Sequence, residues 1–109
     1  GKLEGTAMRV PVITGSVIDL VLSLKKKTTV EEINQTLKNA SNQTLGYTTD
    51  PIVSSDTIGM QYGALVDSLL TAINEVDQKQ LVKVDAWYDN EMSYSAQMLR
   101  TAKYFINLE

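Results

Sequence analysis

Cysteine and histidine are both absent from the 109 residues of the chain. Without them the chain cannot supply a Ser-His or Cys-His nucleophilic pair, a thiolate redox centre, or a zinc site with nitrogen and sulfur ligands. Its own side chains could act in catalysis only through carboxylates, Lys, Tyr or Ser, and no metal site is expected. The lack of cysteine also removes any disulfide argument for a secreted protein.

A concentrated basic face is missing too, because 13 acidic residues outnumber 10 basic ones and the formal net charge is -3. A nucleic-acid partner is therefore not expected. The short basic run at 25–27 is predicted to be a solvated loop. No apolar run approaches the roughly 18 residues that a membrane-spanning helix needs, and no signal-peptide pattern is present. We therefore expect a soluble chain without a membrane partner.

The apolar content is sufficient for one domain. Hydrophobic residues make up 43 % of the chain, which argues against disorder, and the length suits a single core. Strand patterns occur at 8–24, 45–55 and 81–88; Pro11 interrupts the first and Asp50-Pro51 the second. In the third, one face is predicted to carry Val82, Val84, Ala86 and Tyr88.

Two helices are predicted between and after these strands. Thr29 and Glu32 have the spacing of a capping box, and an apolar stripe follows them. Ser95 is the predicted N-cap of a last helix that continues to residue 108. By residue pattern alone the stretch 64–76 fits either a helix or a strand. Strands mixed with two or three helices indicate an α+β unit.

Arg9 is the first residue that could carry chemistry, because it stands alone among aliphatic residues. It must reach solvent, pair with a carboxylate or bind an anion, and its planar fork suits phosphate. The residue type alone favours the first two alternatives.

The stretch 87–95 is the second place that could carry chemistry. It joins a strand to the last helix and contains a Trp, two Tyr, an Asn and two acids. Such a junction can be a ligand-facing corner or a hydrogen-bonded turn with an aromatic anchor. A third, weaker alternative uses Asp85, Asp89 and Glu91 as a cation site or an acid/base pair, although ordinary surface acids have the same spacing.

A family resemblance is carried by six motifs that occur in the family's order. They are Gly1-Lys2-Leu3, Arg9-Val10-Pro11, Gly46-Tyr47-Thr48, Val53-Ser54-Ser55-Asp56, Trp87-Tyr88-Asp89-Asn90-Glu91 and Tyr94-Ser95. Together they resemble the carboxy-terminal part of phosphorylating glyceraldehyde-3-phosphate dehydrogenases, most of all those of low-GC Gram-positive bacteria. The likeness runs along the whole chain.

This resemblance implies that residues 1–109 are the carboxy-terminal part of a catalytic domain. The family oxidises and phosphorylates glyceraldehyde 3-phosphate with NAD and inorganic phosphate, through a thioester, to 1,3-bisphosphoglycerate in glycolysis, and it forms cytoplasmic tetramers. Its Gly-rich nucleotide domain, nucleophilic Cys and His base lie upstream of the matching part. The chain alone is accordingly expected to be inactive and to bind NAD weakly.

The implied fold is a mostly antiparallel sheet with helices on one face. In it the stretch 64–76 becomes a strand that forms a hairpin with 81–88. The last helix, 95–109, is expected to pack on the NAD-binding domain, and so to expose apolar surface in this chain.

Family roles transfer to four matching positions. Arg9 resembles the arginine that binds phosphate, either that of the substrate or the attacking inorganic phosphate. Asn90 resembles the residue that hydrogen-bonds the nicotinamide carboxamide. Tyr94 resembles the tyrosine beside that ring, and Tyr88 the one that lines the thiol pocket. Asp89 and Glu91 become structural partners of this corner.

The chain departs from the family pattern at three positions. Val12 and Ile13 stand where Thr or Pro is common, and Ser93 stands where Gly is common. Alternative functions are an erythrose-4-phosphate dehydrogenase, a binding or adhesion module, or an unrelated α+β domain. The preference for NAD over NADP also stays open at this point.

Overall fold

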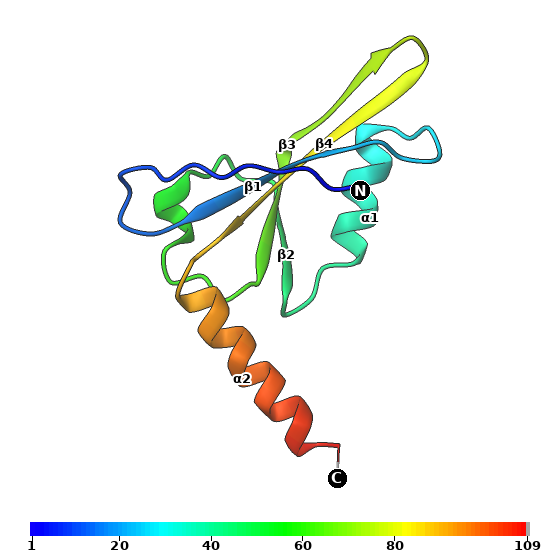
Figure 1. Cartoon of the computed structure of the whole chain (residues 1–109). Coiled ribbons are helices and arrows are strands. Elements are labelled where there is room, and N and C mark those ends of the chain that lie inside the picture. Colours follow the sequence, from blue (N-terminus) through cyan, green and yellow to red (C-terminus); the bar gives the residue numbers. More distant parts are fainter. Residues whose placement is uncertain (109) are drawn as a thin grey trace.

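Four strands form a single mixed sheet in the computed structural model, which describes residues 1–108 (Figure 1). In chain order the elements are β1 (Ser16–Leu22), α1 (Val30–Asn39), β2 (Leu45–Thr48), the 3-10 helix η1 (Ser54–Thr57), β3 (Ala64–Val76), β4 (Lys79–Tyr88) and α2 (Met92–Ile106). The spatial order of the strands is β1-β4-β3-β2. The α+β prediction is therefore confirmed.

Most of the sheet is antiparallel, as predicted. Strand β4 pairs antiparallel with β1 on one side and with β3 on the other, whereas β2 pairs parallel with β3. The stretch 64–76 is a strand, which agrees with the family expectation. Asp77 and Gln78 turn the β3–β4 hairpin with positive φ angles of 49° and 64°, the conformation that matches the twist of two paired strands.

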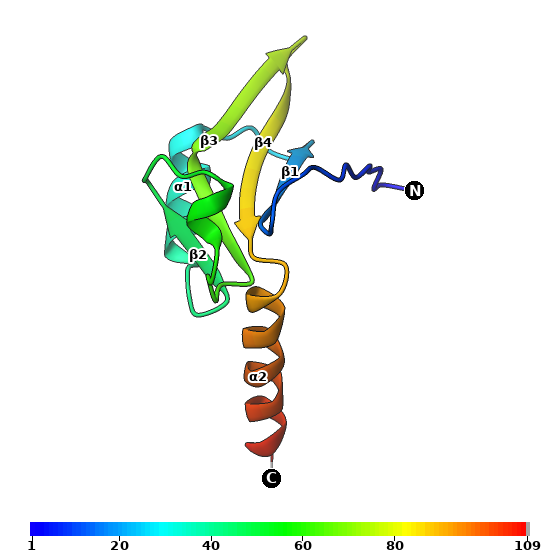
Figure 2. The same ribbon diagram turned by 90° about the vertical axis from the view of Figure 1, so that its left-hand side faces the viewer.

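The core lies between the sheet and α1, which covers one face (Figure 2). Val66 on β3 and Val82 and Val84 on β4 are buried, and the less buried Lys83 separates the two valines of β4 as the alternation of a strand requires. Partly buried side chains pack against these three, namely Ile33, Leu37, Leu45, Tyr47 and Ile73.

Helix α2 continues from the end of β4 and extends away from the sheet (Figures 1 and 2). Its apolar side chains are largely exposed, including Leu99 at 68 % and Phe105 at 65 %. The helix begins at Met92, so the predicted N-cap at Ser95 is wrong: the Ser95 hydroxyl instead donates to the Glu91 carbonyl inside the first turn. Residue 109, the end of the predicted range, lies outside the described residues.

Two predicted strands are shorter in the structure. Residues 1–15 belong to no helix or strand, because Pro11 lacks a ladder donor and Gly15 adopts a φ of 97°. The strand predicted over 45–55 ends at Thr48 before Asp50-Pro51, and η1 follows. There the Asp56 carboxylate accepts a hydrogen bond from the Val53 amide at 2.8 Å.

An irregularity in β3 explains why its pattern is also compatible with a helix. The register against β4 shifts between Asp67 and Ala72, and the Asp67 carboxylate accepts the amide hydrogen of Leu69 at 3.1 Å. Such a bulge breaks the two-residue alternation that identifies a strand.

Among residues 1–108 no helix combines the length and apolar character that crossing a membrane requires.

The capping box predicted for α1 is present. The Thr29 hydroxyl accepts the Glu32 amide hydrogen at 3.2 Å, and the Glu32 carboxylate accepts that of Thr29 at 3.1 Å. We expect Thr29→Ala to lower the free energy of unfolding by about 1 kcal/mol, since it leaves a helix-end N–H without its acceptor. Urea unfolding would measure the loss. Thr29→Ser keeps the hydroxyl and should stay close to wild type; equal losses in both variants would contradict the role of the cap.

Candidate functional site

Three separate segments meet where β4 passes into α2. They are the approach to β1 at 14–16, the turn after η1 at 57–60, and the junction at 88–94; together we call them the corner. Hydrogen bonds from side chains of the junction join it to the other two segments. This is the region that the residue pattern and the family resemblance both single out.

Asp89 is the polar centre of the corner. Its carboxylate is buried, and Oδ1 accepts the amide hydrogens of Glu91 at 2.9 Å and Met92 at 2.8 Å. Oδ2 accepts the amide hydrogen of Gly59 at 2.9 Å. One carboxylate thus satisfies free N–H groups at the start of α2 and also attaches the turn after η1.

These backbone donors favour the charged form of the carboxylate. The amides of Met92 and Gly59 hold the pKa of Asp89 below the usual value for an aspartate, although its burial acts in the opposite direction. Asp89 is therefore a structural anion. This agrees with the expectation that it supports the corner rather than exchanging protons.

Ser93, in the first turn of α2, connects the helix to the Asp89 backbone and to the turn after η1. Its buried hydroxyl accepts the Asp89 amide hydrogen at 3.1 Å and lies 3.4 Å from the Met60 carbonyl, to which it donates. The serine that replaces the common family glycine therefore adds two contacts to the corner.

Asn90 and Glu91 face the approach to β1. The Asn90 Oδ1 atom accepts the Gly15 amide hydrogen at 3.1 Å, and the Asn90 Nδ2 atom donates to the Ser16 hydroxyl at 2.9 Å. The Glu91 carboxylate accepts the Thr14 hydroxyl hydrogen at 2.7 Å. Two consecutive residues of the junction thus bind three consecutive residues of the β1 approach.

Gly15 allows the approach to β1 to lie close to η1. Its φ of 97° is strained for any L side chain, and an added Cβ would lie 2.9 Å from the Ser54 carbonyl oxygen and 3.2 Å from the Thr57 hydroxyl. No residue pattern identifies Gly15 or Ser16 as part of a site, because their partners lie 74 and 75 residues away. A glycine before a strand signals only an irregular backbone.

The two tyrosines that the family resemblance singles out, Tyr94 beside the nicotinamide and Tyr88 in the thiol pocket, differ in exposure. Tyr88 is half-buried at the end of β4 and lies directly opposite Ser16 in the β1–β4 register. Tyr94 lies in the first turn of α2 and is 71 % exposed. Both belong to the corner, with Asn90 between them in the chain.

Arg9 lies outside the corner, in the exposed segment 1–15. Within residues 1–108 its guanidinium forms no hydrogen bond or ion pair, so its donors are available. Thr14 is the fifth residue after Arg9, and a fully extended chain spans that separation with about 18 Å at most. The structure does not bring Arg9 into contact with Asn90 or the tyrosines.

The three acids of the cation alternative have separate partners. The Asp85 carboxylate accepts a hydrogen bond from the Lys83 ammonium at 2.6 Å, while Asp89 and Glu91 are used as described above. This hydrogen bond to Asp85 raises the pKa of Lys83. Across residues 1–108, no group of three or more potential ligand residues is placed to hold a metal ion.

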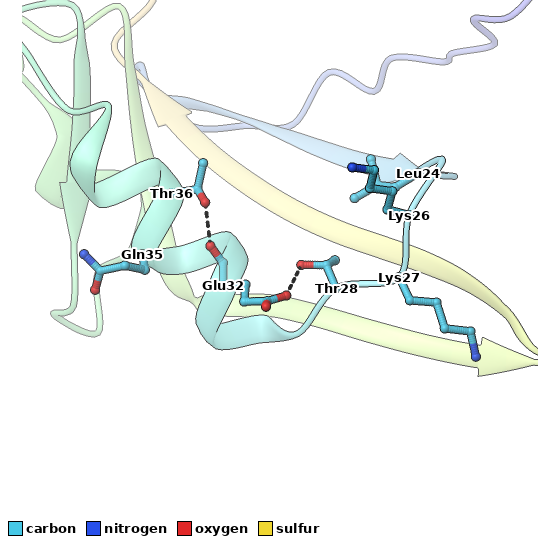
Figure 3. A pocket seen from close by; sticks show the side chains of 7 residues that line it. All are labelled: Leu24, Lys26, Lys27, Thr28, Glu32, Gln35 and Thr36. Carbon is cyan, nitrogen blue, oxygen red and sulfur yellow. Dashed lines mark hydrogen bonds between the residues drawn. The ribbon is translucent and has the colours of Figure 1, made fainter.

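Two shallow grooves lie beyond the polar centre of the corner. One lies beside the start of α1 (Figure 3) and is lined by Leu24, Lys26, Lys27, Thr28, Glu32, Gln35 and Thr36. Lys27 points away from Glu32 and binds Glu75 instead. The run 25–27 is exposed, as predicted. The other groove follows α2, with Tyr62, Leu99 and Arg100 among its lining residues.

The corner can hold a ligand by hydrogen bonding and stacking, but it carries no nucleophile or proton-transfer pair. Asn90 supplies an exposed amide with a fixed orientation, and Tyr94 supplies an exposed aromatic ring a single helical turn away. An amide can donate to and accept from a carboxamide, and a ring can pack against a flat heterocycle. These features fit a flat heterocyclic ligand that carries a polar group such as a carboxamide.

Comparisons with known proteins indicate a family for this chain. Residues 1–90 match the family model described as "Glyceraldehyde 3-phosphate dehydrogenase, C-terminal domain". Over 108 residues the chain is 58 % identical to a glyceraldehyde-3-phosphate dehydrogenase of Streptococcus pyogenes and 57 % identical to one of Clostridium acetobutylicum. Each match covers 99 % of this chain and 32 % of the relative, so the chain spans about a third of their length.

The lowered pKa of Asp89 gives a pH prediction. Because the folded-state pKa lies below the unfolded value of about 3.9, this carboxylate stabilises the fold above that value, and the stabilisation is lost as the pH falls through the folded pKa. Asp89→Asn should cost about 2 kcal/mol at neutral pH, since it turns an amide NH2 toward backbone N–H groups. The difference from wild type should shrink toward pH ~2.

Unfolding free energies measured from pH 7 down to about 2 would test this expectation. Asp77→Asn is the matched control, because it removes an exposed carboxylate from the β3–β4 turn at a positive φ that asparagine also tolerates. A difference between wild type and Asp89→Asn that stays constant with pH would contradict the anionic role.

Proposed function

The chain belongs to the family of the glyceraldehyde 3-phosphate dehydrogenase C-terminal domain, and we propose that it is part of the catalytic domain of such an enzyme. The proposed reaction is the NAD-dependent oxidation and phosphorylation of glyceraldehyde 3-phosphate, in glycolysis. The nucleophile and general base would come from residues outside this chain, which has neither Cys nor His. Its own part in the reaction is binding and orientation.

The observation that carries this proposal is the exposed Asn90 amide, fixed by the β1 approach in the corner. In the proposed role, Asn90 would donate a hydrogen bond to the nicotinamide carboxamide and so set which ring face meets the substrate. Tyr94 would pack near the ring, and Tyr88 would line the adjoining pocket. NAD, when bound, supplies the hydride acceptor.

Arg9 is the proposed phosphate ligand. Its two parallel N–H donors match two phosphate oxygens, and within the described part of the chain no carboxylate neutralises them. The phosphate could belong to the substrate or be the attacking inorganic phosphate.

The surroundings of the corner support an assembly larger than this chain. Apolar residues of α2 that lack cover here, Leu99 and Phe105 among them, would pack on the NAD-binding domain. We further propose a cytoplasmic homotetramer, as the family resemblance implies.

Arg9→Ala in the full-length enzyme is expected to lower kcat/KM by about 10- to 150-fold, because it removes a charge-assisted hydrogen-bonding pair worth roughly 1.5 to 3 kcal/mol. Steady-state kinetics with glyceraldehyde 3-phosphate and phosphate each varied would measure the loss. Arg9→Lys keeps the charge but loses the fork, and should lie between wild type and Arg9→Ala. Unchanged kinetics in both substrates would rule out the phosphate role.

Asn90→Ala in the same enzyme should weaken productive NAD binding and lower kcat/KM for NAD by roughly 10-fold, because the carboxamide loses its hydrogen-bond partner. Stopped-flow measurement of the hydride-transfer rate would separate this loss from product release. Gln35→Ala, on the exposed surface of α1, is a control that should leave the rate unchanged. A nicotinamide-dependent rate equal to wild type would count against the role of Asn90.

A further inference from the structure

The start of β1 determines which way the Asn90 amide faces. The Gly15 amide is a donor only, so the Asn90 atom 3.1 Å from it must be the acceptor Oδ1. Nδ2 consequently lies toward the Ser16 hydroxyl, at 2.9 Å. The opposite amide orientation would place an NH2 group against a backbone N–H, and it is therefore disfavoured.

The Gly15 amide selects the orientation, and the Ser16 hydroxyl then holds the Asn90 amide in place with both of its hydrogen-bonding functions. Its oxygen accepts from Nδ2, and it also lies 3.1 Å from Oδ1, to which it donates. Within residues 1–108 the second N–H of Nδ2 has no partner. Asn90 therefore presents one free donor outward, while its acceptor side is occupied.

A strand, rather than a loop, positions this hydroxyl. Ser16 is the first residue of β1 and lies directly opposite Tyr88 in the antiparallel register with β4. Opposed residues of antiparallel strands project to the same face, so the Ser16 hydroxyl and the Tyr88 side chain share one side of the sheet. The sheet register thereby fixes where the Asn90 amide can lie.

We propose that Ser16 is a positioning residue, which with the Gly15 backbone amide holds Asn90 so that its free N–H faces the carboxamide oxygen of the nicotinamide. This inference rests on the proposed function, because it specifies how Asn90 would recognise the cofactor. The bond from Thr14 to Glu91 supports the same geometry, since it joins the next pair of residues along the two segments. Ser16 then acts on specificity through Asn90 and does not touch the cofactor.

The test compares NAD with thionicotinamide adenine dinucleotide in the full-length enzyme. The analogue replaces the carboxamide oxygen with sulfur, a weaker acceptor, so a well-aimed donor distinguishes the two cofactors. We expect Ser16→Ala to lower kcat/KM for NAD by about 3- to 10-fold, but that for the analogue by less than about 2-fold. Ser16→Thr keeps the hydroxyl and should stay within about 2-fold of wild type with both cofactors.

The controls separate the inference from the proposed function. If Asn90→Ala removes the preference for NAD while Ser16→Ala leaves it unchanged, the positioning role is wrong and the proposed function stands. If Asn90→Ala itself leaves the preference unchanged, the carboxamide contact fails, and the inference fails with it. An equal loss with both cofactors in Ser16→Ala would indicate a merely structural effect and would also overturn the inference.

A second variant keeps the test informative if Ser16→Ala does not fold. Ser16→Cys is nearly the same size, but its thiol is a weak donor and a weak acceptor. It should reproduce the selective loss with NAD at a wild-type melting temperature. A Ser16→Cys enzyme with the full wild-type preference for NAD would contradict the proposal.

Discussion

The carboxylate of Asp89 is the interaction on which the corner depends. A buried charge is stable only when hydrogen bonds replace its hydration, and here three backbone N–H groups do so. Two of these donors belong to the start of α2 and one to the turn after η1. The direction in which α2 leaves the sheet and the position of that turn are therefore set by the same group, whose charge is favoured by its surroundings.

The sheet supplies the other half of the corner. Because β4 pairs with β1 from Ser16 to Leu22, the residues before β1 arrive beside the residues after β4. Asn90 and Glu91 bind this approach, whereas Asp89 binds the turn after η1. Successive side chains of one short junction thus connect to different segments. The Asn90 amide acquires a fixed orientation from hydrogen bonds to Gly15 and Ser16.

Features that depend on neighbours in the chain are predictable from the sequence. Thr29 and Glu32 lie three residues apart, and the strand alternation through Val82 and Val84 needs no knowledge of a partner. The start of α2 is harder to predict from the sequence. The group that satisfies its first amides is the Asp89 carboxylate, which lies before the helix and cannot be told from other acidic residues by its type. Ser95 has the residue type of an N-cap, but the Asp89 carboxylate accepts the amide hydrogens of Glu91 and Met92, and the helix begins at Met92, before Ser95.

The residues of the candidate site also fall into those that the sequence indicates and those that only the fold reveals. Residue types and a family resemblance indicate Arg9, Tyr88, Asn90 and Tyr94, because these side chains have chemistry of their own. Gly15 and Ser16 carry no such signal: their importance arises only when β1 and β4 are paired and a distant amide falls within 3.1 Å. Since Gly15 contributes a backbone donor, no substitution other than proline removes that donor. The orientation of the Asn90 amide is thus a property of the sheet register, which brings the Gly15 amide to its Oδ1 atom. If Asn90 has the proposed role, a change in the register would alter cofactor recognition without replacing a ligand-binding side chain.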